Sequence, residues 1–136
     1  MGQQQLLLLV LGIVIVGLAV VVGIDAFYEN QKKANLDALV SDGVRIASDV
    51  QTWSLKASVF GGPGDGEDWT DATFTKIGYG AESDGSYANA SGSFKLDEGT
   101  ITAWGLDSTN VVTIVISGTR PEDVSTTASS SGTLVN

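Results

Sequence analysis

Residues 1–30 read MGQQQLLLLVLGIVIVGLAVVVGIDAFYEN, and this stretch decides the architecture of the chain. Every residue from Leu6 to Ile24 is apolar or glycine, and the first charged side chain is Asp25. A helix of these 19 residues is about 28 Å long, close to the thickness of the hydrocarbon core of a bilayer. Because such a helix is apolar on every side, it needs lipid or many copies of itself around it.

The apolar segment lacks the features of a cleaved secretion signal. Such a signal has basic residues before a shorter apolar stretch and small residues at the cleavage site. Residues 1–5 contain no lysine or arginine, and no A-x-A pattern follows Val22. N-myristoylation is excluded because the position that requires serine or threonine is Leu6. We therefore expect the segment to remain in the finished protein.

The same helix is expected to continue to about residue 60. No proline lies between Met1 and Phe60, and the helix breakers first gather at Gly61-Gly62-Pro63-Gly64. Within residues 25–60, apolar or small residues recur at alternating spacings of three and four, which places them on one side of a helix. They are Leu36, Leu39, Gly43, Ile46, Val50, Trp53, Ala57 and Phe60, and the opposite side carries Asp37, Asp42, Arg45, Asp49 and Lys56. This amphipathic half needs a small domain packed on its apolar stripe.

The residues after the helix predict that domain to be an antiparallel sheet. Runs of alternating or β-branched residues occur at 91–99, 100–106 and 110–118, with turn-forming residues between them. We expect a meander of three or four strands laid on the helix, which is an α+β fold. Residues 73–80 are expected to form a short strand or an irregular segment. The Ser/Thr-rich residues 121–136 are expected to form a flexible tail or an extended surface strand.

The composition excludes several kinds of chemistry. The chain has no histidine and no cysteine, so it lacks the commonest general base, thiolate ligands, thiol nucleophiles and disulfides. No phosphate-binding loop or other catalytic motif occurs, and we expect no enzyme activity, no cofactor and no metal ion. The net charge is −9, from 16 acidic and 7 basic residues, which opposes binding to nucleic acid.

Two surface segments carry weaker signals. Acidic residues cluster between Asp65 and Asp71, but their spacing differs from that of a hand-type calcium loop, so we expect a solvated acidic loop. Asn89-Ala90-Ser91 is an acceptor sequon for N-glycosylation within a turn-rich segment, which makes Asn89 the candidate modification site.

Taken together, these features resemble the type IV pilin family and its pseudopilin relatives. The resemblance rests on the short polar N-terminus, the apolar segment Leu6–Ile24, the Phe27-Tyr28 pair and the amphipathic continuation into a small β-rich domain. In that family the apolar half-helix anchors the subunit in the inner (plasma) membrane and then becomes the core of an extracellular helical filament. The resemblance also implies a prepilin peptidase that removes a leader, methylation of the new N-terminus, and dedicated assembly machinery.

The resemblance divides the chain into four parts and assigns the assembly residues. The parts are the half-helix 1–24, its amphipathic continuation 25–60, a loop and antiparallel sheet at 61–120, and the tail 121–136. The residues expected to carry self-assembly are Met1, Gln5, Leu6, Leu9, Gly12, Ile13, Val16, Gly17, Val20, Ile24, Phe27 and Tyr28.

The sequence departs from the family pattern in two ways. Pilins usually have a glutamate at the fifth mature position, which pairs with the terminal amine of a neighbour. With Met1 as the mature start, that position is Gln5, which can hydrogen-bond the amine but cannot neutralise it. Processing after Gly2 would instead place Leu7 there. The proline usual near the end of the apolar segment is also absent, and the segment carries three glycines, each of which weakens a helix by about 1 kcal/mol relative to alanine.

Three functions remain open at this point. The chain could be the structural subunit of a type IV pilus-like filament, a minor pilin or pseudopilin of a secretion system, or a membrane-anchored binding module with a single span. The unbroken helix favours a pilin, because a tethered binding domain more often has a flexible break just outside the membrane.

Overall fold

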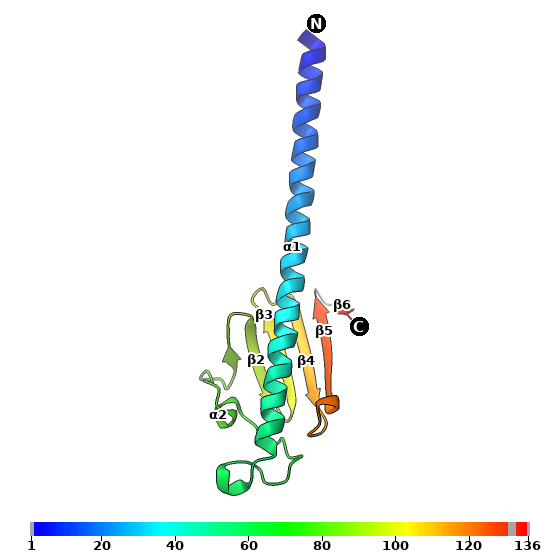
Figure 1. Ribbon diagram of the computed structural model, residues 1–136. Helices are drawn as coiled ribbons and strands as arrows, with labels where there is room; N and C mark the ends of the chain where they lie inside the picture. The colour runs from blue at the N-terminus through cyan, green and yellow to red at the C-terminus, as the bar shows by residue number, and fades with distance from the viewer. Residues whose placement is uncertain (1, 131–132, 136) are drawn as a thin grey trace. The chain divides into compact units, whose positions relative to one another are not determined.

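The computed structural model describes residues 2–130 and 133–135 (Figure 1). The chain divides into two units, the first ending at Lys33 and the second beginning at Ala34, and each is described by itself. Helix α1 spans Gly2–Ser54, so the first unit is helical throughout its described length. The second unit, here called the head unit, contains the rest of α1 and a six-stranded sheet.

The sheet of the head unit is an antiparallel meander in which the spatial order of the strands equals their order in the chain. The α+β prediction is therefore confirmed, with six strands where three or four were expected. The elements after α1 are η1 (Ser58–Phe60), α2 (Phe74–Ile77), β1 (Tyr87–Ala88), β2 (Gly92–Asp97), β3 (Thr100–Gly105), β4 (Asn110–Ile116), η2 (Pro121–Asp123), β5 (Val124–Ser130) and β6 (Thr133–Val135).

The additional strands come from segments with weak strand signals. Strand β1 has only two residues, Tyr87 and Ala88, which pair with Phe94 and Ser93 of β2. Strands β5 and β6 lie in the Ser/Thr-rich segment, and β5 pairs with β4 along its whole length. Of the two interpretations of the tail, the extended strand is therefore the one that the structure has at Val124–Ser130 and Thr133–Val135. Backbone pairing to β4, which the Ser/Thr composition does not reveal, holds this segment in place.

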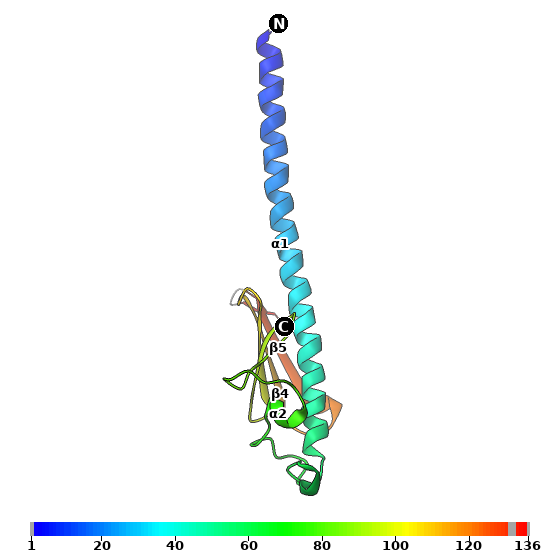
Figure 2. The ribbon, with the colours of Figure 1, turned by 90° about the vertical axis from the view of Figure 1, so that its left-hand side faces the viewer.

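The core lies between the sheet and the part of α1 that belongs to the head unit, which crosses one face of the sheet (Figures 1 and 2). Alternate residues of the strands point toward the helix because side chains alternate between the two faces of a sheet. Phe94, Ile101, Ala103, Val112 and Ile114 are fully buried in this way, and they meet Leu39, Ile46, Ala47, Val50 and Trp53 of α1.

The helix ends at Ser54, six residues before the expected end. The Ser54 hydroxyl lies within hydrogen-bond distance of the carbonyl oxygens of Gln51, at 2.7 Å, and Gly66, at 3.1 Å, which share its one proton. The backbone N–H of Lys56 donates to the carbonyl oxygen of Trp53 in a tightened last turn. The apolar stripe therefore stops at Trp53. Phe60, assigned to the buried side from its spacing, is 81% exposed, because the backbone has left the helix before reaching it.

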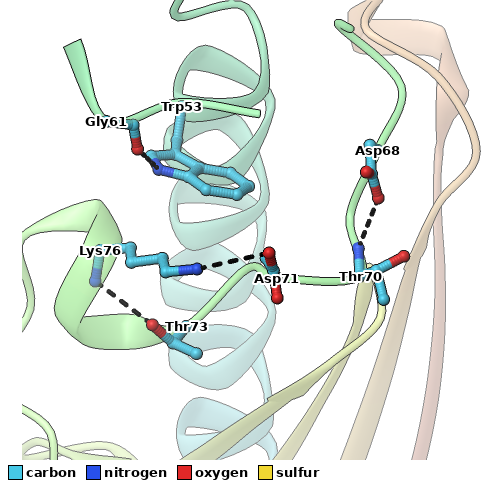
Figure 3. A network of polar contacts seen from close by, with 7 residues as sticks. All are labelled: Trp53, Gly61, Asp68, Thr70, Asp71, Thr73 and Lys76. Atoms are coloured by element: carbon cyan, nitrogen blue, oxygen red, sulfur yellow. Dashed lines mark hydrogen bonds and ion pairs between the residues drawn. The ribbon is translucent and has the colours of Figure 1, made fainter. Parts of the chain in front are cut away.

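The loop after the helix is braced by polar contacts (Figure 3). The indole Nε1 of Trp53 donates to the carbonyl oxygen of Gly61 at 3.1 Å, and Lys76 forms an ion pair with Asp71 at 3.9 Å. Residues 73–80 contain helix α2, in place of the expected strand or irregular segment. Thr73 caps its N-terminus by accepting from the N–H of Lys76, and Gly78 ends it in the left-handed conformation, at φ 94°.

A substitution of Gly92 tests the packing of the sheet. Gly92 pairs with Gly105, and a Cβ at this position would overlap the carbonyl oxygen of Trp104, which the strand pairing holds in place. We expect Gly92→Ala to lower the free energy of unfolding of the head unit by about 1–3 kcal/mol. Denaturant titration of the detergent-solubilised protein, followed by circular dichroism, measures this. Gly80→Ala is the control, since no atom lies within 4 Å of its Cβ position; equal stability of the two variants would contradict the packing.

Candidate assembly surface

The apolar segment of α1 is exposed on all sides. The large apolar side chains from Leu6 to Ile24 are between 52% and 70% exposed, and none contacts the core of the head unit. Within the part of the chain that the structure describes, α1 is the one helix that is long and apolar enough to cross a membrane. The segment therefore has the length for a bilayer and the exposed surface for contacts with other molecules.

The predicted assembly residues lie on this helix. Gln5, Leu6, Leu9, Gly12, Ile13, Val16, Gly17, Val20, Ile24, Phe27 and Tyr28 are all helical and exposed, while Met1 lies outside the described residues. Their spacing places them along one side of α1. The other side carries Leu7, Leu11, Val14, Leu18 and Val21 and is equally apolar and exposed, so one chain by itself gives no preference between the two sides.

Small residues follow one line along the same segment. Gly12, Ala19 and Ala26 are seven residues apart, and positions seven apart lie almost on one line of a helix. A Cβ added at Gly12 or Gly17 would meet no atom within 4 Å. Nothing inside the chain requires glycine at these positions, so the space that they leave is open to a neighbouring helix.

The net charge of the chain is confined to one unit. In the first unit Asp25 and Glu29 are balanced by Lys32 and Lys33, so the net charge of −9 belongs to residues 34–136. A helical unit with no net side-chain charge is thus followed in sequence by a strongly acidic folded unit. This distribution favours hydration of the head unit and leaves the apolar segment Leu6–Ile24 without charged side chains.

Two polar residues of α1 fasten the helix to the sheet near the start of the head unit. The Asn35 amide donates to the carbonyl oxygen of Ser91 at 2.8 Å and accepts from the Asn110 amide at 3.1 Å. One oxygen of Asp42 accepts from the Asn89 amide at 2.9 Å and from the Ser91 hydroxyl at 2.7 Å. Asp42 was expected on the solvent side of the helix. Its position beside the stripe lets a turn of the head unit cover it, and it is half-buried.

Further contacts fix the helix toward its end. The buried Gln51 amide donates to the carbonyl oxygens of Gly118 and Arg120, both at 2.8 Å, in the connection between β4 and β5. The Tyr79 hydroxyl donates to Asp49 at 2.5 Å. Burial, and then this bond to a carboxylate, raise the pKa of Tyr79. The Tyr79 hydroxyl therefore keeps its proton, and continues to donate it to Asp49, at a higher pH than an exposed tyrosine would.

The glycosylation sequon is built into the contact with Asp42. The side-chain oxygen of Asn89 accepts from the backbone N–H groups of Ser91 and Gly92, and its amide nitrogen donates to Asp42. A glycan on that nitrogen would compete with Asp42. Modification of Asn89 in the folded protein would therefore have to break this contact first.

The acidic loop is ordered by local hydrogen bonds. Asp68 accepts from the N–H of Thr70 at 3.0 Å, and this bond lowers the pKa of the Asp68 carboxyl group. Asp84, further along the chain, accepts from Ser86 in the same way and has a lowered pKa. Within residues 2–130 and 133–135, no group of three or more His, Cys, Asp or Glu side chains is placed to hold one metal ion.

Comparisons with protein-family models, with curated proteins and with solved structures gave no match to this chain. The functional argument therefore rests on the residues and their geometry.

The sequence did not reveal one exposed apolar group. Leu55, Val59 and Phe60 lie just after α1 and point into solvent, with exposed fractions of 64%, 88% and 81%. Their spacing could have indicated this exposure for two of them, because Leu55 and Val59 do not fit the three-and-four periodicity of the stripe. An apolar residue outside that periodicity is either past the helix end or on its outer face.

The contact of Asp42 with the head unit can be tested directly. Removing the carboxylate in Asp42→Ala leaves the Asn89 amide and the Ser91 hydroxyl without their acceptor. We expect the free energy of unfolding to fall by about 2 kcal/mol, since hydrogen bonds to a charged group contribute about 1.5–3 kcal/mol. Thermal or denaturant unfolding in detergent measures the change. Asp37→Ala removes the same charge from an exposed position of the same helix and should change stability by less than about 0.5 kcal/mol; a loss as large as that of Asp42→Ala would disprove the assignment.

Proposed function

We propose that this protein is the structural subunit of a type IV pilus-like filament and polymerises through its apolar N-terminal helix. One observation carries the proposal: the exposed apolar segment Leu6–Ile24 belongs to the same helix, Gly2–Ser54, that forms part of the core of the head unit. A simple anchor requires no such continuity. A filament subunit does, because the helix that packs in the filament core must also hold its own head unit in register.

The energetics favour two successive environments for the segment. In water its exposure is strongly unfavourable, at about 25 cal/mol per Å² of apolar surface. Lipid and a bundle of identical helices both remove this surface from water, so the hydrophobic effect by itself does not select between them. Close packing between helices does favour the bundle over lipid. The line of small residues Gly12, Ala19 and Ala26 lets helices approach closely. We therefore expect the segment to sit in the membrane first and in a filament core afterwards.

The partners follow from this route. The chain binds other copies of itself, contacts membrane lipid before assembly, and depends on a prepilin peptidase and on machinery that extracts subunits from the membrane. The filament is extracellular, with the acidic head units on its outside. A minor pilin or pseudopilin would share this geometry. The amount of this protein in the cell distinguishes these from a major subunit, which is made in large excess.

A charge within the segment tests the filament core. We expect Val14→Asp to abolish filaments and leave the protein in the membrane fraction, because an unpaired carboxylate in the bundle has no partner. In a bilayer the same change costs about 3 kcal/mol at the centre of a span. Electron microscopy of material sheared from cells, with peptide mass spectrometry of that fraction, measures the outcome.

Val14→Leu is the matched control and should assemble normally, since it keeps the position apolar. Filaments of normal yield from Val14→Asp would disprove the proposed packing. If the unmodified protein occurs only in detergent-extracted membranes and never in filaments, the anchored binding module replaces the filament subunit.

A further inference from the structure

The face of the sheet that points away from α1 has no charged residue on three of its strands, although residues 34–136 carry a net charge of −9 (Figure 2). Alternate residues of β3, β4 and β5 point to this face, and they are threonine, serine, valine and Trp104. The strand register places Thr102 opposite Thr113 and Trp104 opposite Val111. These side chains are half-buried or exposed, so the face is accessible to a ligand.

An open hollow of about 510 Å³ lies on this face, over β2, β3 and the turn that joins them. Its volume is within the usual range of small-molecule sites, about 300–1,000 Å³. The pairing of β2 with β3 gathers its side chains, because it sets Lys95 opposite Thr102 and Asp97 opposite Thr100. The full lining is Lys95, Asp97, Glu98, Thr100, Thr102 and Trp104.

The fold makes no use of the polar groups in the hollow. None of its six side chains forms a hydrogen bond, an ion pair or a ring contact with any other group of residues 2–130 and 133–135. Trp53 differs in this respect, because its indole is buried and donates to the carbonyl oxygen of Gly61. The indole of Trp104, together with the hydroxyl and carboxylate groups around it, is therefore free to contact a ligand.

The turn that borders the hollow is held in place. Glu98 and Gly99 are the two residues between the paired Asp97 and Thr100, and both have positive φ, at 43° and 81°. The first position of such a turn favours asparagine or glycine, and here it carries a glutamate. Trp69 packs against Gly99, and the carbonyl oxygen of Gly99 accepts from the N–H of Ile116 at 3.0 Å. These contacts fix the turn before any ligand arrives, which lowers the entropy cost of binding.

We propose that this hollow binds a neutral saccharide, with one sugar ring packed on the indole of Trp104 and its hydroxyl groups bonded to Thr102 and Asp97. A sugar ring presents C–H groups on its faces and hydroxyl groups around its edge. The indole supplies a broad apolar surface for the ring and one N–H donor. Lysine only donates, carboxylates only accept, and threonine hydroxyls do both, so the hollow can satisfy either role of a sugar hydroxyl.

The charges around the hollow favour an uncharged ligand. The lining has one base, Lys95, and two acids, Asp97 and Glu98. Glu82 and Asp84 lie with Lys95 in an adjoining hollow. The surroundings are therefore negative on balance and repel an anionic ligand, while a cationic group in the hollow would meet the ammonium of Lys95. A neutral saccharide encounters neither penalty.

The site belongs to a single head unit, so the inference does not depend on the proposed filament. If copies assemble through α1 as we propose, the site repeats on every head unit, on the face that points away from the helix. A polysaccharide would then occupy several sites at once. Its overall affinity would exceed that of one site by a large factor, so a weak single site is sufficient for attachment.

The experiment uses the full chain, solubilised in dodecyldimethylamine oxide so that no detergent with a sugar headgroup competes for the hollow. Isothermal titration calorimetry measures the binding of three neutral probes, which are cellohexaose, maltohexaose and N-acetylated chitohexaose. We expect at least one of them to bind with a dissociation constant of about 1 mM, an ordinary value for an open site that contacts one or two rings.

Substitutions in β3 locate the binding. Trp104→Thr removes the indole, keeps a residue that favours strands, and should weaken binding about tenfold. Thr102→Val removes one hydroxyl group at nearly constant shape and should weaken binding about threefold. Thr113→Val is the matched control, because it makes the same change at the paired position of β4, outside the hollow, and should bind like the unmodified chain. Circular dichroism checks the fold of each variant, and Thr102→Val decides if Trp104→Thr does not fold.

Each outcome supports or overturns the saccharide site. Binding of a neutral probe that both β3 variants weaken and Thr113→Val retains supports it. No binding of any neutral probe at about 10 mM overturns it, as does equal binding by the unmodified chain and the folded β3 variants. Tighter binding of polygalacturonate or of deacetylated chitohexaose than of every neutral probe also overturns it. Because the solubilised chain is used, none of these results bears on whether the protein forms filaments.

Discussion

This chain leaves the all-round apolar segment Leu6–Ile24 of α1 uncovered, and the rest of the structure depends on this constraint. The large apolar side chains from Leu6 to Ile24 are exposed, and the head unit uses its own apolar residues for its own core. The apolar surface of the segment has to be covered by lipid or by other protein molecules. The acidic charge of residues 34–136 follows the same logic, because a chain with such a segment aggregates unless the remainder strongly favours water.

Within the head unit, a few polar residues beside the apolar stripe bond α1 to the connections of the sheet. Asn35 and Asp42 bind the turn before β2, and Gln51 binds the connection between β4 and β5. Apolar packing against the stripe provides most of the stabilisation but tolerates sliding, since it has little directionality. Directional bonds near both ends of the packed segment fix the register between helix and sheet. In the filament that we propose, this fixed register would give every copy the same arrangement of helix and sheet.

The sequence predicted the features that depend on strong local patterns. An uninterrupted apolar segment, the periodic positions Leu39, Ile46 and Val50, and the β-branched run of β4 lead directly to the long helix, the buried stripe and the meander. The features that it missed depend on tertiary contacts. The end of α1 at Ser54 is set by a hydroxyl that bonds across the loop to Gly66, and β5 is held by β4 and not by its own composition. For the candidate assembly surface, the sequence identified the apolar helix but placed Phe60 in the core, because a periodic pattern does not show where the backbone leaves the helix.

The strand order of the sheet has a consequence for how the protein matures. Each strand from β2 to β6 pairs with the strand made just before it, so the sheet can grow at one edge as the polypeptide emerges. A chain held in a bilayer by its first residues would deliver α1 before any strand, and the helix would be present as a template when β2 arrives. Such a head unit can fold in the order of its translocation without waiting for the C-terminus, which limits the time during which unpaired strand edges are open to neighbouring chains.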